Sequence, residues 1–398
     1  MRRLRVLTFT SLFPNARQPQ HGLFVRERVR ALARLCDLEV VAPVPWSPSL
    51  PGLPDRYRTY RAVPSTEEQY ELAVAHPRFV VIPKVLKRTD GLLMGLSCAA
   101  AIEAIKRRFP FDVIDAHWAY PDGVAAMLAA QRVRTPFSIT VRGDDVNVFA
   151  KERGRGPWIR RALSSASLVI AVSTALKDAV LELTNGAARI AVIPNGIEPT
   201  RFSPVDRSVA RRRLNLPPGD RLILSVGRLH ESKGHAVLTE AVGRIVHRFA
   251  NVRLVLIGDP DSEADARPAI LAAAERAGLG DRLLMPGAQD PRVMRLWYSA
   301  ADLFALPTSR EGSPNVIREA LACGLPCVTT AVGGIPEVLT DARLGRLVPP
   351  TADDFAAALA DALARPWDRA AIARAGADRT WDVVAAECLQ HLSEIARS

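Results

Sequence analysis

The residues best suited to chemistry are two glutamates eight positions apart, Glu311 and Glu319. Ser313 and Pro314 between them predict the start of a helix, because serine is a good N-cap and proline fits the first turn. This helix, running to about Ala322, leaves Glu311 in the loop ahead of it and carries Glu319 within it. Carboxylates accept strong hydrogen bonds from hydroxyls, so the pair could grip two hydroxyl-bearing groups of an extended ligand. The same pattern also fits a capping carboxylate followed by a solvated helical glutamate.

The predicted helix directly follows a predicted strand at 303–306. The first N–H groups of a helix have no partner within it, and together they attract anions. We therefore expect the N–H groups of Asn315 and Val316 to face the crevice beyond the strand ends, where doubly wound sheets bind their ligands.

Two cations, Arg228 and Lys233, form a second candidate group after a strand predicted at 221–226. Gly227 and Gly234 flank them and allow a close approach of the backbone. The cations suit a diphosphate, since no carboxylate pair stands beside them to hold a magnesium ion. Solvated loop charges remain the alternative interpretation.

Short β-branched runs alternate with longer helical stretches, which indicates βαβ units and parallel sheets. The strands predicted in the first half are 5–10, 38–41, 113–115, 137–141, 168–171 and 190–193. Those predicted in the second half are 221–226, 253–257, 283–285, 303–306 and 327–330. Two sets of strands predict an α/β protein with two sheets.

Prolines and an Asn-Gly turn in the segment 193–204 interrupt the pattern and indicate a hinge. We predict an N-terminal domain over 1–198, a second domain over 199–380 and a C-terminal helix over 381–398 that packs back on the N-terminal domain. The proline-rich segment 43–66 is predicted to be irregular.

The chain has 398 residues, of which 48% are hydrophobic and 24% charged, so it can build packed cores and is not disordered. Its longest apolar stretch, 92–102, is about half the length that spans a bilayer and predicts a buried helix. The five scattered cysteines have no zinc spacing and are expected to be reduced core thiols.

The net charge of +11 is concentrated in the first half of the chain. Residues 1–200 hold 28 Lys+Arg and 18 Asp+Glu, a net +10, which leaves +1 for residues 201–398. The basic half is expected to face an anionic partner such as a phospholipid surface or a lipid diphosphate. Nucleic acid is not expected, because basic and aromatic residues are not interleaved.

Four segments together resemble the retaining glycosyltransferases of family 4, which have the GT-B fold. They are the Glu-x7-Glu segment, the Gly-Arg-x4-Lys-Gly loop, the hinge VIPNGIEPTRFSP and the run EALACGLPCVTTAVGGIPEVL. The resemblance covers nearly the whole chain and implies two doubly wound, Rossmann-like domains that face a central cleft. The forms AYPDG and TVRGDDV look most like the branch of teichuronic acid and exopolysaccharide glycosyltransferases.

The resemblance also implies roles for individual residues. Arg228 and Lys233 would neutralise the donor diphosphate, Glu311 would bind hydroxyls of the donor sugar, and Glu319 would bind the ribose. His117, within Asp115-Ala-His-Trp-Ala-Tyr-Pro-Asp-Gly123, would lie near the transferred sugar and act in catalysis with Glu311, Arg228 and Lys233. The remaining donor contacts expected from the family are Gly22, Gly312, Asn315 and Val316.

Two departures from the family pattern stand out. Arg142 occupies a position where many members have a histidine before the glycine. The glycine-rich turn after the second strand of the second domain is reduced to Gly258-Asp-Pro-Asp261.

The function expected from the resemblance is retaining transfer of a hexose-type sugar from a nucleotide diphosphate sugar to a glycan or lipid-linked acceptor. UDP-sugar is expected on family frequency, with GDP-sugar open. No metal or other cofactor is expected, since Asp144-Asp145, an adjacent acidic pair, belongs to the other domain. A cytoplasmic enzyme held peripherally at the inner face of the membrane is expected. The alternatives are a GT-B nucleotide-sugar epimerase and a noncatalytic basic binding protein.

Overall fold

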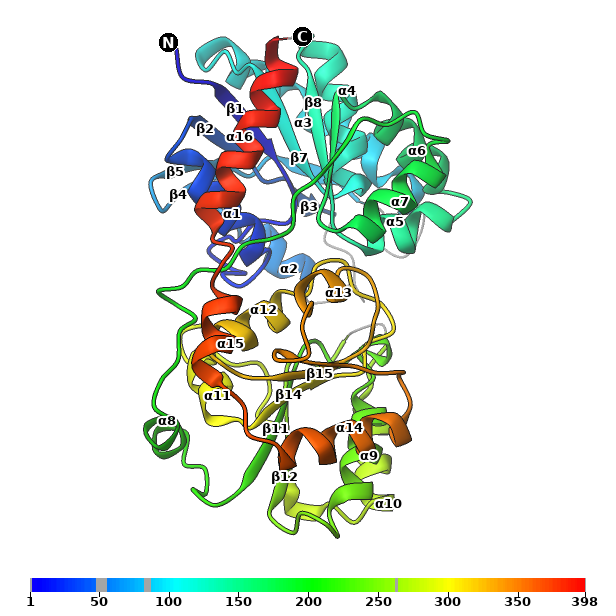
Figure 1. Ribbon diagram of the computed structural model, residues 1–398. Helices are drawn as coiled ribbons and strands as arrows, with labels where there is room; N and C mark the ends of the chain where they lie inside the picture. The colour runs from blue at the N-terminus through cyan, green and yellow to red at the C-terminus, as the bar shows by residue number, and fades with distance from the viewer. Residues whose placement is uncertain (1, 48–55, 82–86, 262–263, 398) are drawn as a thin grey trace. The chain divides into compact units, whose positions relative to one another are not determined.

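The computed structural model describes residues 2–47, 56–81, 87–261 and 264–397. The chain divides into two compact units, Met1–Gly196 with Trp381–Ser398, and Ile197–Thr380 (Figure 1). The first division falls inside the predicted hinge, two residues before the predicted boundary at 198. The second follows Thr380, where the C-terminal helix was expected to begin.

The first unit is built on an eight-stranded sheet with the order β10-β9-β8-β7-β1-β2-β5-β4. Neighbouring strands are parallel except β4 and β5. Its strands are β1 (Arg5–Phe9), β2 (Asp37–Val41), β4 (Thr66–Gln69), β5 (Leu72–Ala75), β7 (Val113–His117), β8 (Phe137–Val141), β9 (Leu168–Ala171) and β10 (Ile190–Val192). The six strands predicted for this half are all present. The direction of the strand order changes between β1 and β7, which makes the loops after these strands the switch point where such sheets bind ligands.

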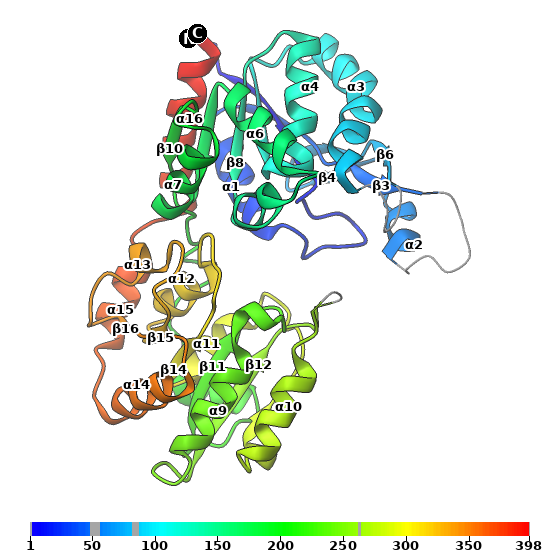
Figure 2. The same ribbon diagram turned by 90° about the vertical axis from the view of Figure 1, so that its right-hand side faces the viewer.

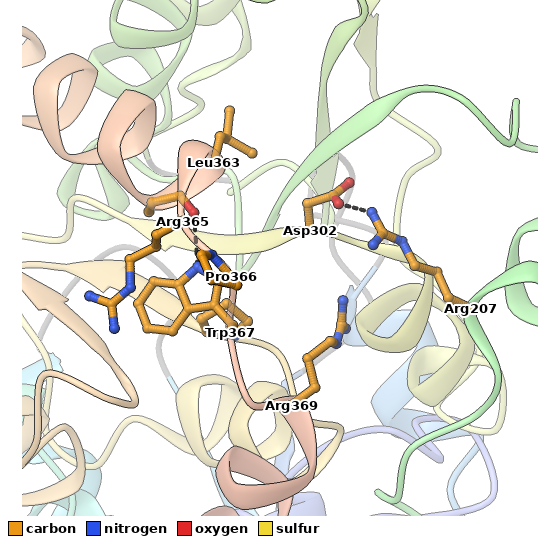
Figure 3. A pocket seen from close by; sticks show the side chains of 9 residues that line it. Arg207, Asp302, Leu363, Arg365, Pro366, Trp367 and Arg369 are labelled. Carbon is orange, nitrogen blue, oxygen red and sulfur yellow. Dashed lines mark hydrogen bonds and ion pairs between the residues drawn. The ribbon is translucent and has the colours of Figure 1, made fainter.

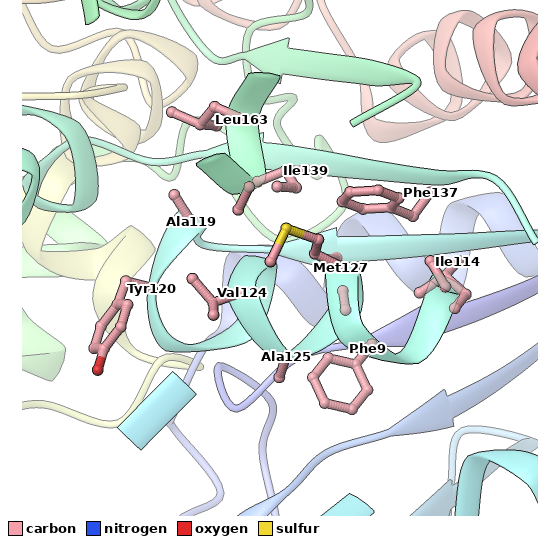
Figure 4. Close-up of a cluster of buried hydrophobic side chains, with 14 of the residues drawn as sticks. Phe9, Ile114, Ala119, Tyr120, Val124, Ala125, Met127, Phe137, Ile139 and Leu163 are labelled. Carbon is pink, nitrogen blue, oxygen red and sulfur yellow. The ribbon is translucent and has the colours of Figure 1, made fainter. Parts of the chain in front are cut away.

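Helices cover this sheet, and an apolar core lies between them. They are α1 (Leu23–Ala33), α2 (Arg56–Arg61), α3 (Asp90–Arg108), α4 (Val124–Val133), α5 (Asp144–Asn147), α6 (Gly156–Ser165), α7 (Thr174–Leu183) and α16 (Trp381–Arg397). Figure 4 shows Val124 and Met127 of α4 among Phe9, Ile114 and Ile139, which come from three adjacent strands. Both faces of a parallel sheet must be covered in this way, which explains its continuous apolar strands.

The C-terminal helix α16 belongs to the first unit. Its apolar side, with Val384, Cys388 and Leu392, packs among residues of the sheet that include Val6 and Ile170 (Figures 1 and 2). Because that side is fully buried, α16 is part of the core of the first unit although it follows the second unit in the sequence.

The segment 43–66, predicted to be irregular, contains regular structure in its described part. It includes β3 (Val44–Trp46), helix α2 and the first residue of β4, whereas residues 48–55 lie outside the described residues. Strand β3 pairs in parallel with β6 (Arg78–Val80), more than thirty residues later in the chain. The local sequence did not reveal this strand because its hydrogen-bonding partner is distant.

The second unit holds a six-stranded parallel sheet with the order β13-β12-β11-β14-β15-β16. Its strands are β11 (Arg221–Val226), β12 (Val252–Ile257), β13 (Leu283–Leu284), β14 (Leu303–Leu306), β15 (Cys327–Thr329) and β16 (Gly345–Leu347). Its helices are α8 (Arg207–Arg213), α9 (His235–Ile245), α10 (Arg267–Arg276), α11 (Met294–Ala300), α12 (Asn315–Ala322), α13 (Ile335–Val338), α14 (Ala352–Ala364) and α15 (Arg369–Gly376). The switch point lies between β11 and β14, the two strands that carry the predicted donor motifs.

The structure also bears on the expectations for the cysteines and for the apolar stretch 92–102. The five cysteines are all free and buried, and burial raises the pKa of Cys36 and Cys98 to about 12. The stretch 92–102 lies inside α3, and within the described part of the chain no helix has the length and apolar character to cross a bilayer.

Candidate functional site

The loops after β11 and β14 are joined by hydrogen bonds at the switch point of the second sheet. The carbonyl oxygen of Ser232 accepts from Thr308 Oγ1 at 3.0 Å and from the N–H of Ser309 at 2.8 Å. Ser232 directly precedes Lys233, and Ser309 lies two positions before Glu311. The two predicted donor motifs are therefore held side by side by the backbone.

Two glycines allow close approaches of the backbone around Glu311: Gly234 between the loops after β11 and β14, and Gly333 between the loop after β15 and Glu311. Gly234 has a φ of +70°, and a Cβ there would lie 2.1 Å from the carbonyl oxygen of Pro307. Gly333 has a φ of +54°, and a Cβ there would lie 1.8 Å from the carbonyl oxygen of Glu311. Any side chain at either position would push the loops apart, so both glycines support the position of Glu311.

Lys233 and Glu311 form an ion pair in which Lys233 Nζ donates to Glu311 Oε2 at 2.7 Å. The side chains keep 23% and 15% of their surface exposed, so each can also reach a ligand. An ammonium has three donors and a carboxylate has several acceptor sites. The pair can therefore hold an anion on the lysine side and hydroxyl groups on the glutamate side.

Arg228 extends from the same loop, with its side chain 70% exposed and paired with Asp261 at 3.0 Å. Asp261 belongs to the shortened turn 258–261, for which the sequence indicated no role. The turn therefore supplies a carboxylate that orients Arg228. No motif predicted this contact, because the two residues come from different strand ends.

Glu319 lies inside α12, as predicted, and is partly buried. Tyr298 of α11 donates its hydroxyl to Glu319 Oε2 at 2.8 Å. Burial raises the pKa of Glu319, and the Tyr298 hydrogen bond opposes this shift. The surroundings of Glu319 are not those of a solvated helical glutamate, which removes that alternative, and Tyr298 is a positioning partner that sequence reasoning missed.

The start of α12 differs in detail from the prediction. The helix begins at Asn315 and ends at Ala322, and Ser313 makes no side-chain cap, because Pro314 occupies the N-cap position. The N–H of Asn315 donates to the carbonyl oxygen of Ser313 at 3.0 Å, which corrects the expectation that it points at a ligand.

The other donor contacts expected in this region lie close by. Val316 is in the first turn of α12, and Gly312 is buried, with its carbonyl oxygen accepting from the N–H of Gly334 at 3.2 Å. The second unit thus brings Lys233, Glu311 and Gly312 together at one switch point.

In the first unit, the loops after β1 and β7 carry the other predicted residues. Gly22 precedes α1 with a φ of +66°, and a Cβ there would lie 2.2 Å from the carbonyl oxygen of Leu12. Asp122, in the loop after β7, accepts from the hydroxyl of Ser11 at 2.9 Å and also from its N–H. Burial raises the pKa of Asp122 to about 7. Ser11 and Asp122 thus tie the loop that carries Gly22 to the loop that follows His117, the last residue of β7.

His117 is the last residue of β7 and is fully buried. Arg142 donates to its Nδ1 at 2.6 Å, and its Nε2 lies 3.2 Å from Asp115 Oδ2. An arginine only donates, so Nδ1 is the acceptor and Nε2 carries the proton. Burial lowers the pKa of His117 to about 4, with the charges of Arg28 and Arg142 contributing. His117 is thus a neutral imidazole with both nitrogens occupied, an arrangement that favours positioning over proton transfer.

Asp115 is the buried anion of this network. It accepts from Arg28 at 3.1 Å and from the hydroxyl of Ser138 at 2.8 Å. Burial opposes its ionisation, but Arg28 and His117 hold the pKa of Asp115 below its usual range. Two arginines, Arg28 and Arg142, thus approach one aspartate and one neutral histidine.

Arg142 also links this network to the hinge. Its Nη1 donates to Asn195 Oδ1 at 3.0 Å, and its guanidinium lies over the ring of Phe24, 5.1 Å from the centroid. Burial lowers the pKa of Arg142 to about 9, with repulsion from Arg28 adding to the shift. The residue that replaces the family histidine is thus a donor bridging β7, α1 and the hinge.

The fold matches solved glycosyltransferases of the GT-B class. A sucrose-phosphate synthase from Thermosynechococcus elongatus superposes with a TM-score of 0.78 at 22% identity, covering 100% of both chains. HepE from Anabaena, solved in complex with UDP and glucose, superposes with a TM-score of 0.74 at 20% identity, covering 98% of this chain and 100% of that one. The two units with their doubly wound sheets therefore form a GT-B fold.

Sequence comparison identifies the family. The model described as "Glycosyltransferase Family 4" matches residues 21–201, and the one described as "Glycosyl transferases group 1" matches 220–365. TuaC of Bacillus subtilis (strain 168), described provisionally as a teichuronic acid biosynthesis glycosyltransferase, is 31% identical over 369 residues, which cover 91% of this chain and 89% of TuaC. A D-inositol 3-phosphate glycosyltransferase of Xylanimonas cellulosilytica is 34% identical over 300 residues, covering 70% and 71%. The chain belongs to glycosyltransferase family 4 and is a glycosyltransferase.

The state of His117 can be measured by nitrogen-detected NMR of the imidazole rings. We expect a neutral Nε2–H tautomer that does not titrate between pH 5.5 and 8, because the pKa of His117 lies at about 4. Since the folded pKa is below the unfolded value of 6.5, the unfolded chain binds the extra proton, and this group lowers the free energy of unfolding as the pH falls from about 6.5 toward 4.

Arg142→Gln should raise the pKa of His117, because a cation that opposes protonation is removed. Arg161→Gln, at an exposed position of α6, is the matched control and should leave the ring signals unchanged. A wild-type His117 that titrates near pH 6.5, or an equal response to both variants, would contradict the assigned network.

Proposed function

We propose that this glycosyltransferase moves a hexose-type sugar from a UDP-sugar to a hydroxyl group of a glycan or lipid-linked acceptor, with retention at the anomeric carbon, in the synthesis of a bacterial cell-surface polysaccharide. The observation that carries the proposal is the Lys233–Glu311 ion pair at the switch point of the second sheet. Support for the nucleotide comes from the HepE complex with UDP and glucose, and support for the pathway class comes from the likeness to TuaC.

The chemistry follows from the charges of this site. The bond between the anomeric carbon and the diphosphate oxygen breaks, and the diphosphate takes the electron pair. Lys233 and Arg228 stabilise that developing charge, which is the role preorganised cations play in transition states. The acceptor oxygen bonds to the same face of the anomeric carbon, and its proton passes to an oxygen of the departing phosphate. No protein nucleophile is required.

Glu311 has a double role in this proposal. One oxygen accepts from Lys233, and the other remains to accept from hydroxyls of the donor sugar. The ion pair thereby sets the distance between the sugar subsite and the diphosphate subsite. Glu319, held in place by the hydrogen bond from the buried Tyr298, provides a further acceptor that suits the ribose hydroxyls.

Coupling between the two charges can be tested with Lys233→Ala, Glu311→Gln and the double variant. We expect each single change to lower kcat/KM by about 100-fold or more, and the double variant to lose little beyond the larger single effect, because each residue holds the other in place. Glu231→Gln, on the same loop and exposed, is the control and should keep its activity. Normal turnover by a folded Glu311→Gln variant, or strictly additive losses, would remove the pair from the mechanism.

A second measurement separates transfer from epimerisation. Release of UDP that depends on an added acceptor indicates transfer, whereas a nucleotide-sugar epimerase does not need an acceptor.

We also propose that transfer is independent of metal ions. Within residues 2–47, 56–81, 87–261 and 264–397, no three His, Cys, Asp or Glu side chains are grouped so as to hold a metal ion. Lys233 and Arg228 supply the positive charge that a magnesium or manganese ion would otherwise provide. Full activity in EDTA is therefore expected, and activity lost on chelation and regained with manganese would overturn this assignment.

A reversible contact with the anionic inner leaflet is the third part of the proposal. Basic residues cluster in the sequence at 84–88, 106–108 and 151–155. Of these, Lys84 lies outside the described residues, while Lys106 is engaged with Phe111 and Thr135. A Cβ at Gly154 would lie 3.0 Å from Cβ of Arg88, so the loop 151–155 lies against Arg88. Lys87, Arg88, Lys151 and Arg153 are exposed on these neighbouring segments and form one basic patch.

Liposome co-sedimentation tests this patch. Each basic side chain near an anionic surface contributes about 1 kcal/mol, so Lys151→Gln with Arg153→Gln should weaken binding by about 30-fold at low salt. Arg107→Gln, exposed near the opposite end of α3, is the control. Equal binding to neutral and anionic vesicles, or binding that the double change leaves intact, would contradict the membrane contact.

A further inference from the structure

A polar cavity lies in the second unit, away from the donor loops. It has a volume of about 220 Å³, and its charged lining residues are Arg207, Asp302, Arg365 and Arg369, with Trp367 forming part of the wall (Figure 3). These residues come from α8, from the turn before β14 and from the segment that leads into α15. Nothing in the proposed transfer reaction uses them.

The strand directions place this cavity at the opposite edge of the sheet from the donor loops. Asp302 directly precedes β14, whereas Glu311 lies in the loop after that strand. Pro326, another lining residue, directly precedes β15. The four residues of β14 span about 13 Å. A ligand bound among the arginines is therefore separated from the Lys233–Glu311 pair by the sheet.

The carboxylate of the cavity is fully occupied. Asp302 pairs with Arg207, accepts from Arg211 at 2.9 Å, and accepts from the N–H of Leu222 at 2.7 Å. It neutralises one of these cations at most. Asp302 is thus shared between Arg207 and Arg211, and Arg369 lies close enough to Arg207 to feel its charge, so positive charge is in excess here.

The other two arginines have neutral partners. Arg369 Nη1 donates to the carbonyl oxygen of Ala301 at 2.9 Å, and Arg365 Nη2 donates to that of Ala342 at 3.4 Å. Arg365 stacks on Trp367, with 3.9 Å between its guanidinium carbon and a ring centroid. The indole is itself fixed by its N–H, which donates to a backbone carbonyl oxygen at 2.8 Å. In Figure 3 the Arg365 guanidinium lies on the other side of this indole from Arg207 and Arg369, so Arg365 and Trp367 form the wall of the cavity and do not face the same ligand as the other two arginines.

The pKa values of Arg369 and Arg207 are both lowered, as expected where positive charges lie together with too few carboxylates. Burial lowers the pKa of Arg369 to about 10, with repulsion from Arg207 contributing. Burial likewise lowers the pKa of Arg207 to about 10, with repulsion from Arg211 and Arg221. In addition, Arg207 Nε is buried without a hydrogen-bond partner among the described atoms. An anion in the cavity would relieve this repulsion.

We propose that this cavity is a binding site for a small phosphate-bearing anion, held by Arg207 and Arg369. Guanidinium groups bind phosphate oxygens through paired, charge-assisted hydrogen bonds, and two of them match the multiple charges of a phosphate better than one carboxylate. The volume is below the roughly 300–1,000 Å³ of pockets that enclose drug-sized ligands, which favours inorganic phosphate, diphosphate or the phosphate group of a small ester.

Calorimetric titration with inorganic diphosphate tests the site, with Lys233→Ala as the background because the donor loops also attract a diphosphate. We expect the Lys233→Ala protein to bind one equivalent, and addition of Arg369→Gln to weaken that binding by about 10-fold or more, since a hydrogen bond to a charged group is lost. Arg374→Gln, exposed on the same helix α15, removes the same charge and should have no effect.

Arg207→Gln is the second variant, so that the assignment does not rest on Arg369 alone, which also donates to the carbonyl oxygen of Ala301. It should weaken diphosphate binding in a protein that still unfolds in one cooperative thermal transition. The dissociation constants of inorganic phosphate and glucose 6-phosphate are then compared. Tighter binding of inorganic phosphate indicates a site for a free anion, and tighter binding of glucose 6-phosphate indicates a site for a phosphate ester. Absence of binding in the Lys233→Ala protein, or binding insensitive to both Arg207→Gln and Arg369→Gln, would overturn the proposal.

Discussion

The carbonyl oxygen of Ser232 is the contact on which the proposed donor site depends. By accepting from both Thr308 and Ser309, it joins the loops that follow β11 and β14, two strands far apart in sequence but adjacent in the sheet. Gly234 allows the backbones of these two loops to approach closely enough for these hydrogen bonds, and Gly333 allows the loop after β15 to lie against Glu311. These backbone contacts bring Lys233 and Glu311 close together. The geometry of their ion pair is therefore set by the backbone and not only by the conformations of two flexible side chains.

In the first unit the site residues are held by buried charged groups, whereas in the second unit they are held by backbone hydrogen bonds. Asp115, Arg28, His117 and Arg142 form a network at the end of β7, with Asn195 of the hinge attached to it. Burying such groups is costly unless every charge is paired and hydrogen-bonded, and this network meets most of that requirement. A histidine at position 142 could present only one donor to His117 at a time, whereas the arginine reaches His117 and Asn195 together. The departure from the family pattern therefore changes how the hinge is attached to β7.

The two sheets share one organisation, and this explains where the functional residues lie. In each sheet the strand order reverses once, between β1 and β7 and between β11 and β14. Loops that follow the strands at a reversal diverge to opposite faces and leave a crevice. Gly22, Lys233 and Glu311 belong to such loops, and His117 is the strand residue directly before one. The arginine-lined cavity lies at the opposite edge of the second sheet, where the chain has the amino ends of its strands.

The sequence by itself determined the α/β class, most of the parallel strands and the two donor motifs, because buried strands, helix starts and glycine loops leave local signals. It also placed Glu311 before a helix and Glu319 within it. Only the tertiary structure decided that Lys233 contacts Glu311, that Asp261 pairs with Arg228, and that Tyr298 donates to Glu319. It likewise decided that Asn315 donates its N–H to Ser313 and that both nitrogens of His117 are occupied. Most of these contacts join residues on different elements. All of them depend on the backbone and side-chain conformations that tertiary packing fixes. A local sequence pattern carries no information about such distances.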